Sequence, residues 1–344
     1  MEDYNGIELR GLMLKVTSKN SDISDVIESM RSLRNLVGKS PELYQNEVLV
    51  EDTAIFATSH MIIDIYNNNE YDKVGLSELC IMWQLIHNLC VGQTLFCQKL
   101  WVQLEEPLLK LLESHDDAKL KNVLSAVLLQ VIKHDIFASN LTMCKKIVKV
   151  LLESIVNDTK ELLQFPLLVI QEFLRNQTEF SLESTYADLD HRQRLALLDI
   201  LAEEKTESLQ KRFVEFLVDS FKTQATILMT VLKRDEIADP SEVSRVLSIL
   251  GIFSHATGCM PLLQSDKSLL IDAVYLLRMV HDVGKTNPNH LFSTVKNMNE
   301  IANQEKMESD PVFGFKRDLI RLIGNLCHEH KENQDQVAIT LISK

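Results

Sequence analysis

The sequence contains few of the residues that turn a β-strand back on itself. Among its 344 residues are only 10 glycines and 7 prolines, whereas hairpins and barrels need glycine, asparagine or proline at their corners. The six cysteines include no CxxC pair, which argues against a redox motif or a zinc site built from such pairs. We therefore expect a helical protein whose cysteines are buried, reduced thiols.

Signals that direct a chain out of the cytosol are also missing. Near the N-terminus, Glu8, Arg10 and Lys15 interrupt any run that could form the apolar core of a signal peptide. No segment approaches the roughly 18 to 20 uncharged apolar residues of a membrane-spanning helix, and no polybasic nuclear import signal is found. We expect a cytoplasmic protein without membrane insertion, although a passage through the nucleus stays open.

What the chain does contain is an excess of acidic residues over basic ones. It has 49 Asp and Glu against 36 Lys and Arg, for a formal net charge of -13, and such a charge repels nucleic acids and anionic membranes. Its 45% hydrophobic content is enough for a buried core. The predicted partners are therefore proteins, with basic segments favoured, and self-association is left open.

Apolar residues recur every three or four positions in several segments, which is the pattern of amphipathic helices. The clearest stripes are Leu120, Val123, Leu124, Val127, Leu128, Val131 and Ile132 in one segment, and Leu269, Leu270, Ala273, Leu276, Leu277 and Val280 in another. Three pairs, Ser40-Pro41, Asp239-Pro240 and Asp310-Pro311, each offer a capping residue followed by a proline at the first helical position. No segment alternates long enough to predict a sheet, so we predict an all-α protein.

Three stretches share one outline: residues 33–48, 86–101 and 323–337 each end an apolar helix with Asn-Leu and place a glutamine in the next amphipathic run. The three pairs are Asn35 and Gln45, Asn88 and Gln98, and Asn325 and Gln334. The first two copies are 53 residues apart, and the polar segment 67–73 accounts for the excess over the about 40 to 47 residues of an armadillo or HEAT unit. The pattern predicts degenerate helical repeats stacked in a right-handed α-solenoid of the armadillo or HEAT type.

The repeated asparagine has two interpretations. Asparagine tolerates the backbone geometry that ends a helix, and the leucine after it seals the core. In armadillo proteins, however, asparagines on the last helix of each unit can form a ladder that binds the backbone of an extended partner. On the second interpretation the candidate protein-binding residues are Asn35, Asn88, Asn325, Arg31, Arg321 and Trp83. For Trp83 the alternative is ordinary core packing.

Residues 310–337, DPVFGFKRDLIRLIGNLCHEHKENQDQV, resemble the opening of the C-terminal block of the ataxin-10 family. That block begins with Phe-Lys-x-x-Leu-Ile-Arg-Leu-Ile-Gly-Asn-Leu and continues with Lys-x-Asn-Gln-Asp. The matching residues are Phe315, Lys316, Leu319, Ile320, Arg321, Leu322, Ile323, Gly324, Asn325, Leu326, Lys331, Asn333, Gln334 and Asp335. We therefore predict degenerate armadillo-like repeats over residues 1–308 and the start of the family block over residues 309–344, continuous with the solenoid.

The resemblance implies a non-enzymatic scaffold for protein interactions. Its implied roles are neuron maintenance and neurite outgrowth, cytokinesis and cilium-associated complexes. In the family the block continues with a Gly-Ile-Pro-Leu-Ile-Leu phrase and a further helical unit, whereas this sequence ends in AITLISK. We therefore expect its last helix to expose apolar side chains that a stacking neighbour would cover.

One alternative involves chemistry. His281-Asp282 resembles the doublet of the HD phosphohydrolases, which are all-α enzymes that hold one or two metal ions, and His255 and Asp310 are available as further ligands. The simpler interpretation places His281 in the last turn of a helix, where a cation suits the helix dipole, and lets Gly284 end that helix. We favour this interpretation and predict no enzyme, no catalytic residue, no cofactor and no bound metal.

Overall fold

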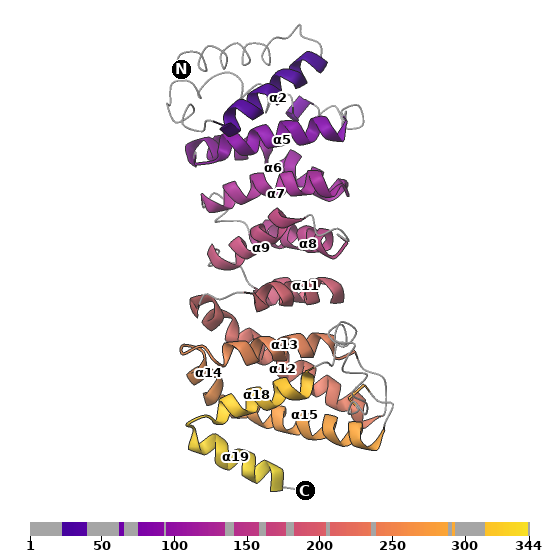
Figure 1. Cartoon of the computed structure of the whole chain (residues 1–344), viewed down its shortest axis with the longest axis vertical. Coiled ribbons are helices and arrows are strands. Elements are labelled where there is room, and N and C mark those ends of the chain that lie inside the picture. Colours follow the sequence, from indigo (N-terminus) through magenta and orange to yellow (C-terminus); the bar gives the residue numbers. More distant parts are fainter. Residues whose placement is uncertain are drawn as a thin grey trace. The chain divides into compact units, whose positions relative to one another are not determined.

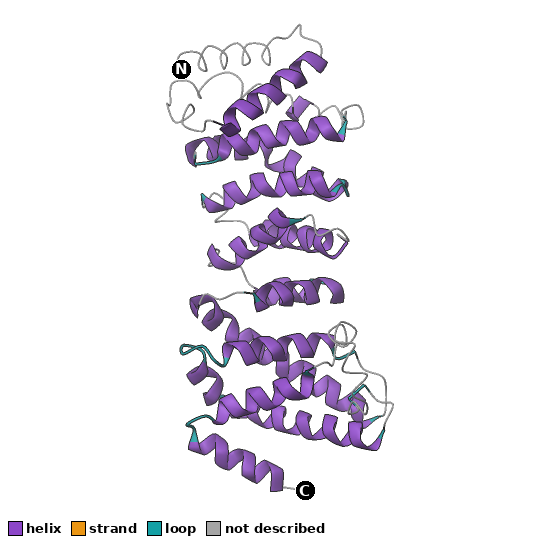
Figure 2. Ribbon diagram, in the orientation of Figure 1, coloured by secondary structure: helices purple, strands orange, loops and turns teal. Residues whose placement is uncertain are grey.

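The computed structural model describes residues 23–39, 62–64, 75–92, 94–134, 141–157, 163–176, 182–203, 207–234, 239–287, 291–292 and 314–342. Over these ranges the regular secondary structure is entirely helical (Figure 2). The predicted all-α solenoid is thus confirmed. The pairs Ser40-Pro41 and Asp310-Pro311 and the polar segment 67–73 lie outside the described residues.

The chain divides into two compact units, Met1–Ser181 and Leu182–Lys344. In the first unit, four helices stack side by side in one layer (Figure 1). They are α2 (Ile23–Lys39), α5 (Leu76–Cys90), α7 (Ala118–Lys133) and α9 (Gln164–Asn176). A second layer consists of α6 (Thr94–Ser114) and α8 (Leu141–Asn157). Since α6 packs on α5, α7 and α8, and α8 packs on α9, each helix buries its apolar face against similar neighbours.

The second unit repeats this arrangement. One layer holds α11 (His191–Ala202), α13 (Ser241–Phe253) and α18 (Phe315–Cys327), and the other holds α12 (Glu207–Lys233), α15 (Lys267–Thr286) and α19 (Lys331–Ile342). Two short helices complete it, α10 (Leu182–Ala187) against α12 and α14 (Met260–Ser265) against α12, α15 and α18. Residues far apart in the sequence, such as those of α13 and α18, therefore lie side by side (Figure 1).

The two predicted apolar stripes form part of the core. All seven residues of the α7 stripe are buried, and Leu129 on another side of this helix is buried as well, because α7 is packed between neighbours in its layer. On α15 five of the six predicted residues are buried, whereas Leu277 is half-buried. The helical period thus identified the core-facing residues correctly in both segments.

The start of α13 differs from the prediction by one position. The helix begins at Ser241, so Pro240 occupies the capping position instead of the first helical one. Asp239 still serves the helix end, because its Oδ1 accepts hydrogen bonds from the backbone N of Ser241 at 2.9 Å and from its hydroxyl at 2.5 Å. Elsewhere the expected chemistry holds: Asp117 caps α7 by accepting from the Leu120 amide at 2.8 Å.

The last two described helices expose some of their apolar side chains to solvent. Ile320 on α18 is 59% exposed, and Ile339 and Leu341 on α19 are 60% and 57% exposed. α19 packs on α15 and α18 with its other side. Among the helices of the described ranges, none combines the length and the apolar character needed to cross a bilayer.

Candidate interaction surface

The repeated asparagine ties neighbouring helices together in the first unit. Asn88 of α5 donates a hydrogen bond from Nδ2 to the backbone carbonyl of Arg34 on α2 at 3.2 Å. In return, Arg34 donates from Nη1 to Oε1 of Gln84 at 2.8 Å and from Nη2 to Oδ1 of Asn35 at 2.7 Å. The bonds made by Asn88 and Gln84 join the C-terminal halves of α2 and α5 and so fix how these two successive helices of one layer align, whereas the bond from Arg34 to Asn35 lies within α2.

The second unit contains the same kind of tie. Asn325 of α18 donates from Nδ2 to the hydroxyl of Ser254 at 2.7 Å, directly after the end of α13. Four residues earlier, the side chain of Arg321 lies over Gly251 of α13, where an added Cβ would be 3.5 Å from Arg321 Cδ. In both units an asparagine near the end of one helix therefore bonds to the preceding helix of its layer.

The leucines of the Asn-Leu pairs behave as the structural interpretation predicts. Leu89 and Leu326 are buried, while Leu36 is half-buried. The second and third copies therefore end with one residue that bonds to the neighbouring helix and one that fills the core, whereas Asn35 of the first copy accepts hydrogen bonds from Arg34 of its own helix. Gln45 of the first copy lies outside the described residues, and Gln98 of the second is exposed on α6.

The phrase that carries the family resemblance builds the corner between α18 and α19. Asn333 is 1% exposed, and its Nδ2 donates to the carbonyls of Gln264 at 3.0 Å and Leu326 at 2.9 Å. Gln334 donates from Nε2 to the carbonyl of Cys327 at 2.9 Å. These amides satisfy carbonyls that the end of a helix leaves without intrahelical donors. Residues that carry the family resemblance thus have a structural role at this corner.

Part of the predicted binding set remains at the surface. Asn35 is exposed near the end of α2, and the side chains of Arg31 and Arg321 are 41% and 40% exposed. Arg31 forms an ion pair with Glu28, and Arg321 lies 3.7 Å from a carboxylate oxygen of Asp318. Exposed, polar side chains of this kind are available to a partner at little cost in desolvation.

Trp83 does not belong to this surface. Its side chain is 0% exposed, and its Nε1 has no hydrogen-bond partner in the described part of the chain. Since α5 is packed against α2, α6 and α7, its bulkiest residue fills the space between them. The core-packing interpretation of Trp83 is correct, and the binding interpretation is not supported by its position.

The His281-Asp282 doublet is solvent-exposed near the end of α15. Within the described ranges, no three His, Cys, Asp or Glu side chains gather in a way that could hold a metal ion, and Asp310 lies outside these ranges. Gly284 does not end the helix, which continues to Thr286. Glycine is needed there because the backbone of Phe292 lies close to it: a Cβ at Gly284 would lie 2.0 Å from the carbonyl oxygen of Phe292.

The cysteines are free thiols, five of them buried and Cys327 half-buried. Burial raises the pKa of the Cys144 thiol to about 11 and also raises the pKa of Cys80 and Cys327. Because the thiolate is the reactive form, these shifts work against a nucleophilic role at neutral pH.

Sequence reasoning missed a buried polar cluster in the second unit. Glu242 of α13 is buried and accepts hydrogen bonds from the hydroxyl of Tyr186 at 2.6 Å and from Nε2 of Gln224 at 2.7 Å. His191 Nδ1 lies 3.4 Å from its other oxygen, and Arg194 Nη1 lies 4.0 Å away. The cluster joins α10, α11, α12 and α13. Its members come from four helices between residues 186 and 242, so no local pattern in the sequence predicts the cluster.

Comparison with known proteins points to one family, although no family model matches the chain. Ataxin-10 of Homo sapiens is 29% identical over 188 residues, which cover 51% of this chain and 38% of that protein. Ataxin-10 of Xenopus tropicalis is 38% identical over 139 residues, 40% of this chain and 27% of the relative. The chain thus spans well under half the length of these curated relatives. Over about half of its own length the chain is similar to ataxin-10, which confirms the resemblance predicted from the sequence.

Proposed function

We propose that the chain is a non-enzymatic scaffold that binds other proteins along the helix ends of its stacked layers. The observation that carries this proposal is that some of the predicted residues bond to a neighbouring helix while others face solvent. Asn88 and Asn325 hold successive helices together, whereas Asn35 and Arg321 are exposed and Arg31 is partly exposed on the helices so aligned. A solenoid presents such surfaces at low cost, since its core needs only neighbouring helices.

The finer biological roles also remain proposals. The resemblance to ataxin-10 supports roles in neuron maintenance and neurite outgrowth, in cytokinesis and in cilium-associated complexes. The excess of acidic residues supports basic protein segments as partners in preference to nucleic acid. We propose a cytoplasmic location, which imaging of the tagged chain in dividing and neuronal cells would check; accumulation in the nucleus would contradict it.

We also propose that residues 309–344 start the family block and continue the solenoid formed by residues 1–308. The packing of α18 on α13 and α15, and of α19 on α15 and α18, supports this continuity. Limited proteolysis is expected to leave the α18–α19 segment attached to a fragment that retains α13 and α15. Release of this segment as a folded piece would contradict the proposal.

Affinity capture with the tagged full chain tests the binding surface. We expect the double variant Arg31→Ala with Asn35→Ala, and separately Arg321→Ala, to lose captured partners without losing helicity in circular dichroism. The matched controls are Gln98→Ala and Lys149→Ala, which change exposed polar side chains on α6 and α8. If the controls lose the same partners, or if no variant loses any, the proposed surface is wrong.

The absence of catalysis is tested on the same purified protein. We expect no stoichiometric transition metal in elemental analysis and no hydrolysis of nucleoside triphosphates. Asp282→Ala would then change nothing, because its side chain is exposed on α15. Bound metal together with hydrolysis that Asp282→Ala abolishes would establish the phosphohydrolase alternative.

A further inference from the structure

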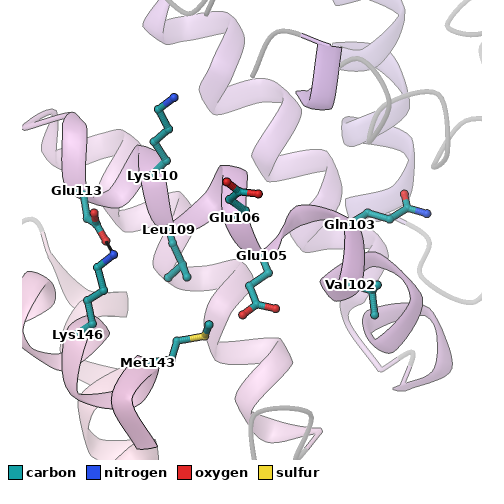
Figure 3. A pocket seen from close by; sticks show the side chains of 9 residues that line it. All are labelled: Val102, Gln103, Glu105, Glu106, Leu109, Lys110, Glu113, Met143 and Lys146. Carbon is teal, nitrogen blue, oxygen red and sulfur yellow. Dashed lines mark ion pairs between the residues drawn. The ribbon is translucent and has the colours of Figure 1, made fainter. Parts of the chain in front are cut away.

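A groove between α6 and α8 is lined by both apolar and charged side chains. It has a volume of about 580 Å³ and is lined by residues of these two helices (Figure 3). Val102, Leu109 and Met143 supply apolar surface. Val102 is 81% exposed, so its side chain is accessible to another molecule. The volume is within the range of about 300 to 1,000 Å³ that is typical of binding pockets.

Three carboxylates line this groove, those of Glu105, Glu106 and Glu113, and the side chain of Glu105 extends toward Met143 (Figure 3). No hydrogen bond or ion pair joins it to another residue in the described part of the chain. Burial raises the pKa of its carboxyl group. The carboxylate has therefore lost some of its water without gaining a cation, and a cation that enters the groove would restore favourable contacts.

Neither lysine of the groove, Lys110 or Lys146, is paired with the carboxylate of Glu105. Lys146 is paired with Glu113, since Lys146 Nζ lies 2.6 Å from Glu113 Oε1 at one end of the groove (Figure 3). Lys110 extends to the opposite side of α6 from Glu105 in the same view. The local charge around Glu105 is thus negative, in keeping with the net charge of -13 for the whole chain.

We propose that this groove binds an arginine side chain from a basic segment of a partner protein. The methylene stem of the arginine would lie on Val102, Leu109 and Met143, and its guanidinium would donate two hydrogen bonds to Glu105. The planar guanidinium is more weakly hydrated than the lysine ammonium, so it suits a half-apolar groove better. The inference rests on the proposed scaffold function and names the chemistry of one contact, at a place separate from the exposed helix ends.

The test uses the full chain and an acetylated, amidated hexa-arginine peptide with a fluorescent label. Binding is measured by fluorescence anisotropy at about 0.15 M salt, where long-range attraction is screened. We expect Glu105→Gln to weaken binding about fivefold, as suits a partly exposed ion pair with added hydrogen bonds. Glu153→Gln on α8 removes the same charge from an exposed site outside the groove and is expected to leave the affinity unchanged.

Two further measurements locate the contact. The methyl resonance of Met143, assigned with the variant Met143→Leu, is expected to shift when hexa-arginine is added to the wild-type chain. Hexa-citrulline, the uncharged analogue of the same shape, should neither bind nor shift it, and hexa-lysine should bind more weakly than hexa-arginine.

Each other outcome overturns the inference. Equal losses in Glu105→Gln and Glu153→Gln would mean that only the overall charge attracts the peptide, and an unmoved Met143 resonance would place the contact elsewhere. If the wild-type chain does not bind hexa-arginine, the groove does not take arginine. The scaffold proposal would survive all of these results, because it is tested separately by capture with the Arg31, Asn35 and Arg321 variants.

Discussion

Replacing Tyr186 by phenylalanine isolates one hydrogen bond of the buried cluster around Glu242. The substitution removes only the hydroxyl, which donates to Glu242 at 2.6 Å. The ring keeps its edge contact with Phe216, with centroids 5.2 Å apart, and its position under the guanidinium of Arg194. Any loss of stability can therefore be assigned to the contacts of the hydroxyl, which are the bond to Glu242 and a hydrogen bond with Ser220, with little contribution from packing.

The expected loss follows from the charge and burial of the acceptor. A hydrogen bond to a charged group contributes roughly 1.5 to 3 kcal/mol, because the buried carboxylate cannot replace the lost donor with water. Glu242 retains the donor of Gln224 at 2.7 Å, so the lower half of that range applies. We expect Tyr186→Phe to lower the free energy of unfolding of the second unit by about 2 kcal/mol.

The effect of this bond depends on pH at the alkaline end. Burial, followed by the hydrogen bond to Glu242, raises the pKa of Tyr186 above its ordinary value. A raised pKa means that the stabilisation is complete below the pKa of about 10 of an unfolded tyrosine, and is lost as the pH rises toward the folded value. The difference between wild type and Tyr186→Phe should therefore narrow above about pH 10.

The assay is urea unfolding followed by far-ultraviolet circular dichroism, with hydrogen exchange of peptides from α10 to α13 to locate the change. Tryptophan fluorescence is unsuitable, because Trp83 and Trp101 both belong to the first unit. Tyr275→Phe is the control, since that tyrosine is 43% exposed on α15. A loss for Tyr186→Phe no greater than the loss for Tyr275→Phe would refute the reasoning, as would a difference that stays constant up to pH 11.

Three other predictions concern the remaining ties of the fold. Asn333→Ala removes a buried donor from two carbonyls, so it should lower the free energy of unfolding by about 2 kcal/mol and speed hydrogen exchange in α19. Exchange in α19 at the wild-type rate would contradict this prediction. The pKa of Asp266 is lowered: burial raises it, but hydrogen bonds from Lys222, from Ser268 and from the Leu269 amide outweigh burial. The free energy of unfolding should therefore fall below about pH 4. This fall should be less steep in Lys222→Met. Acid titration followed by circular dichroism measures this, and identical acid profiles would refute it. Asn88→Ala removes the bond from α5 to the α2 backbone and should cost about 1 kcal/mol in urea unfolding, with faster exchange in α2, while a neutral change would show that the tie is dispensable.

Local patterns in the sequence determined the fold class and the core-facing residues. The stripe from Leu120 to Ile132 predicted which side chains of α7 are buried, because helical period and burial both depend on neighbours within a few residues. The recurrence of Asn-Leu predicted stacked, similar units, and the residues around Asn325 predicted the resemblance to ataxin-10. These features depend on short-range geometry, which the order of residues already contains.

The partners of those residues were decided only by the tertiary structure. The acceptor of Asn88 lies 54 residues away and that of Asn325 lies 71 residues away, so no local pattern shows whether these amides face a partner or the neighbouring helix. The same holds for Trp83, whose burial depends on the helices packed around α5, and for the cluster at Glu242. Stacking brings distant segments together. It alone decides which polar groups bond to other residues of the fold and which, such as the carboxylate of Glu105, stay accessible to another molecule.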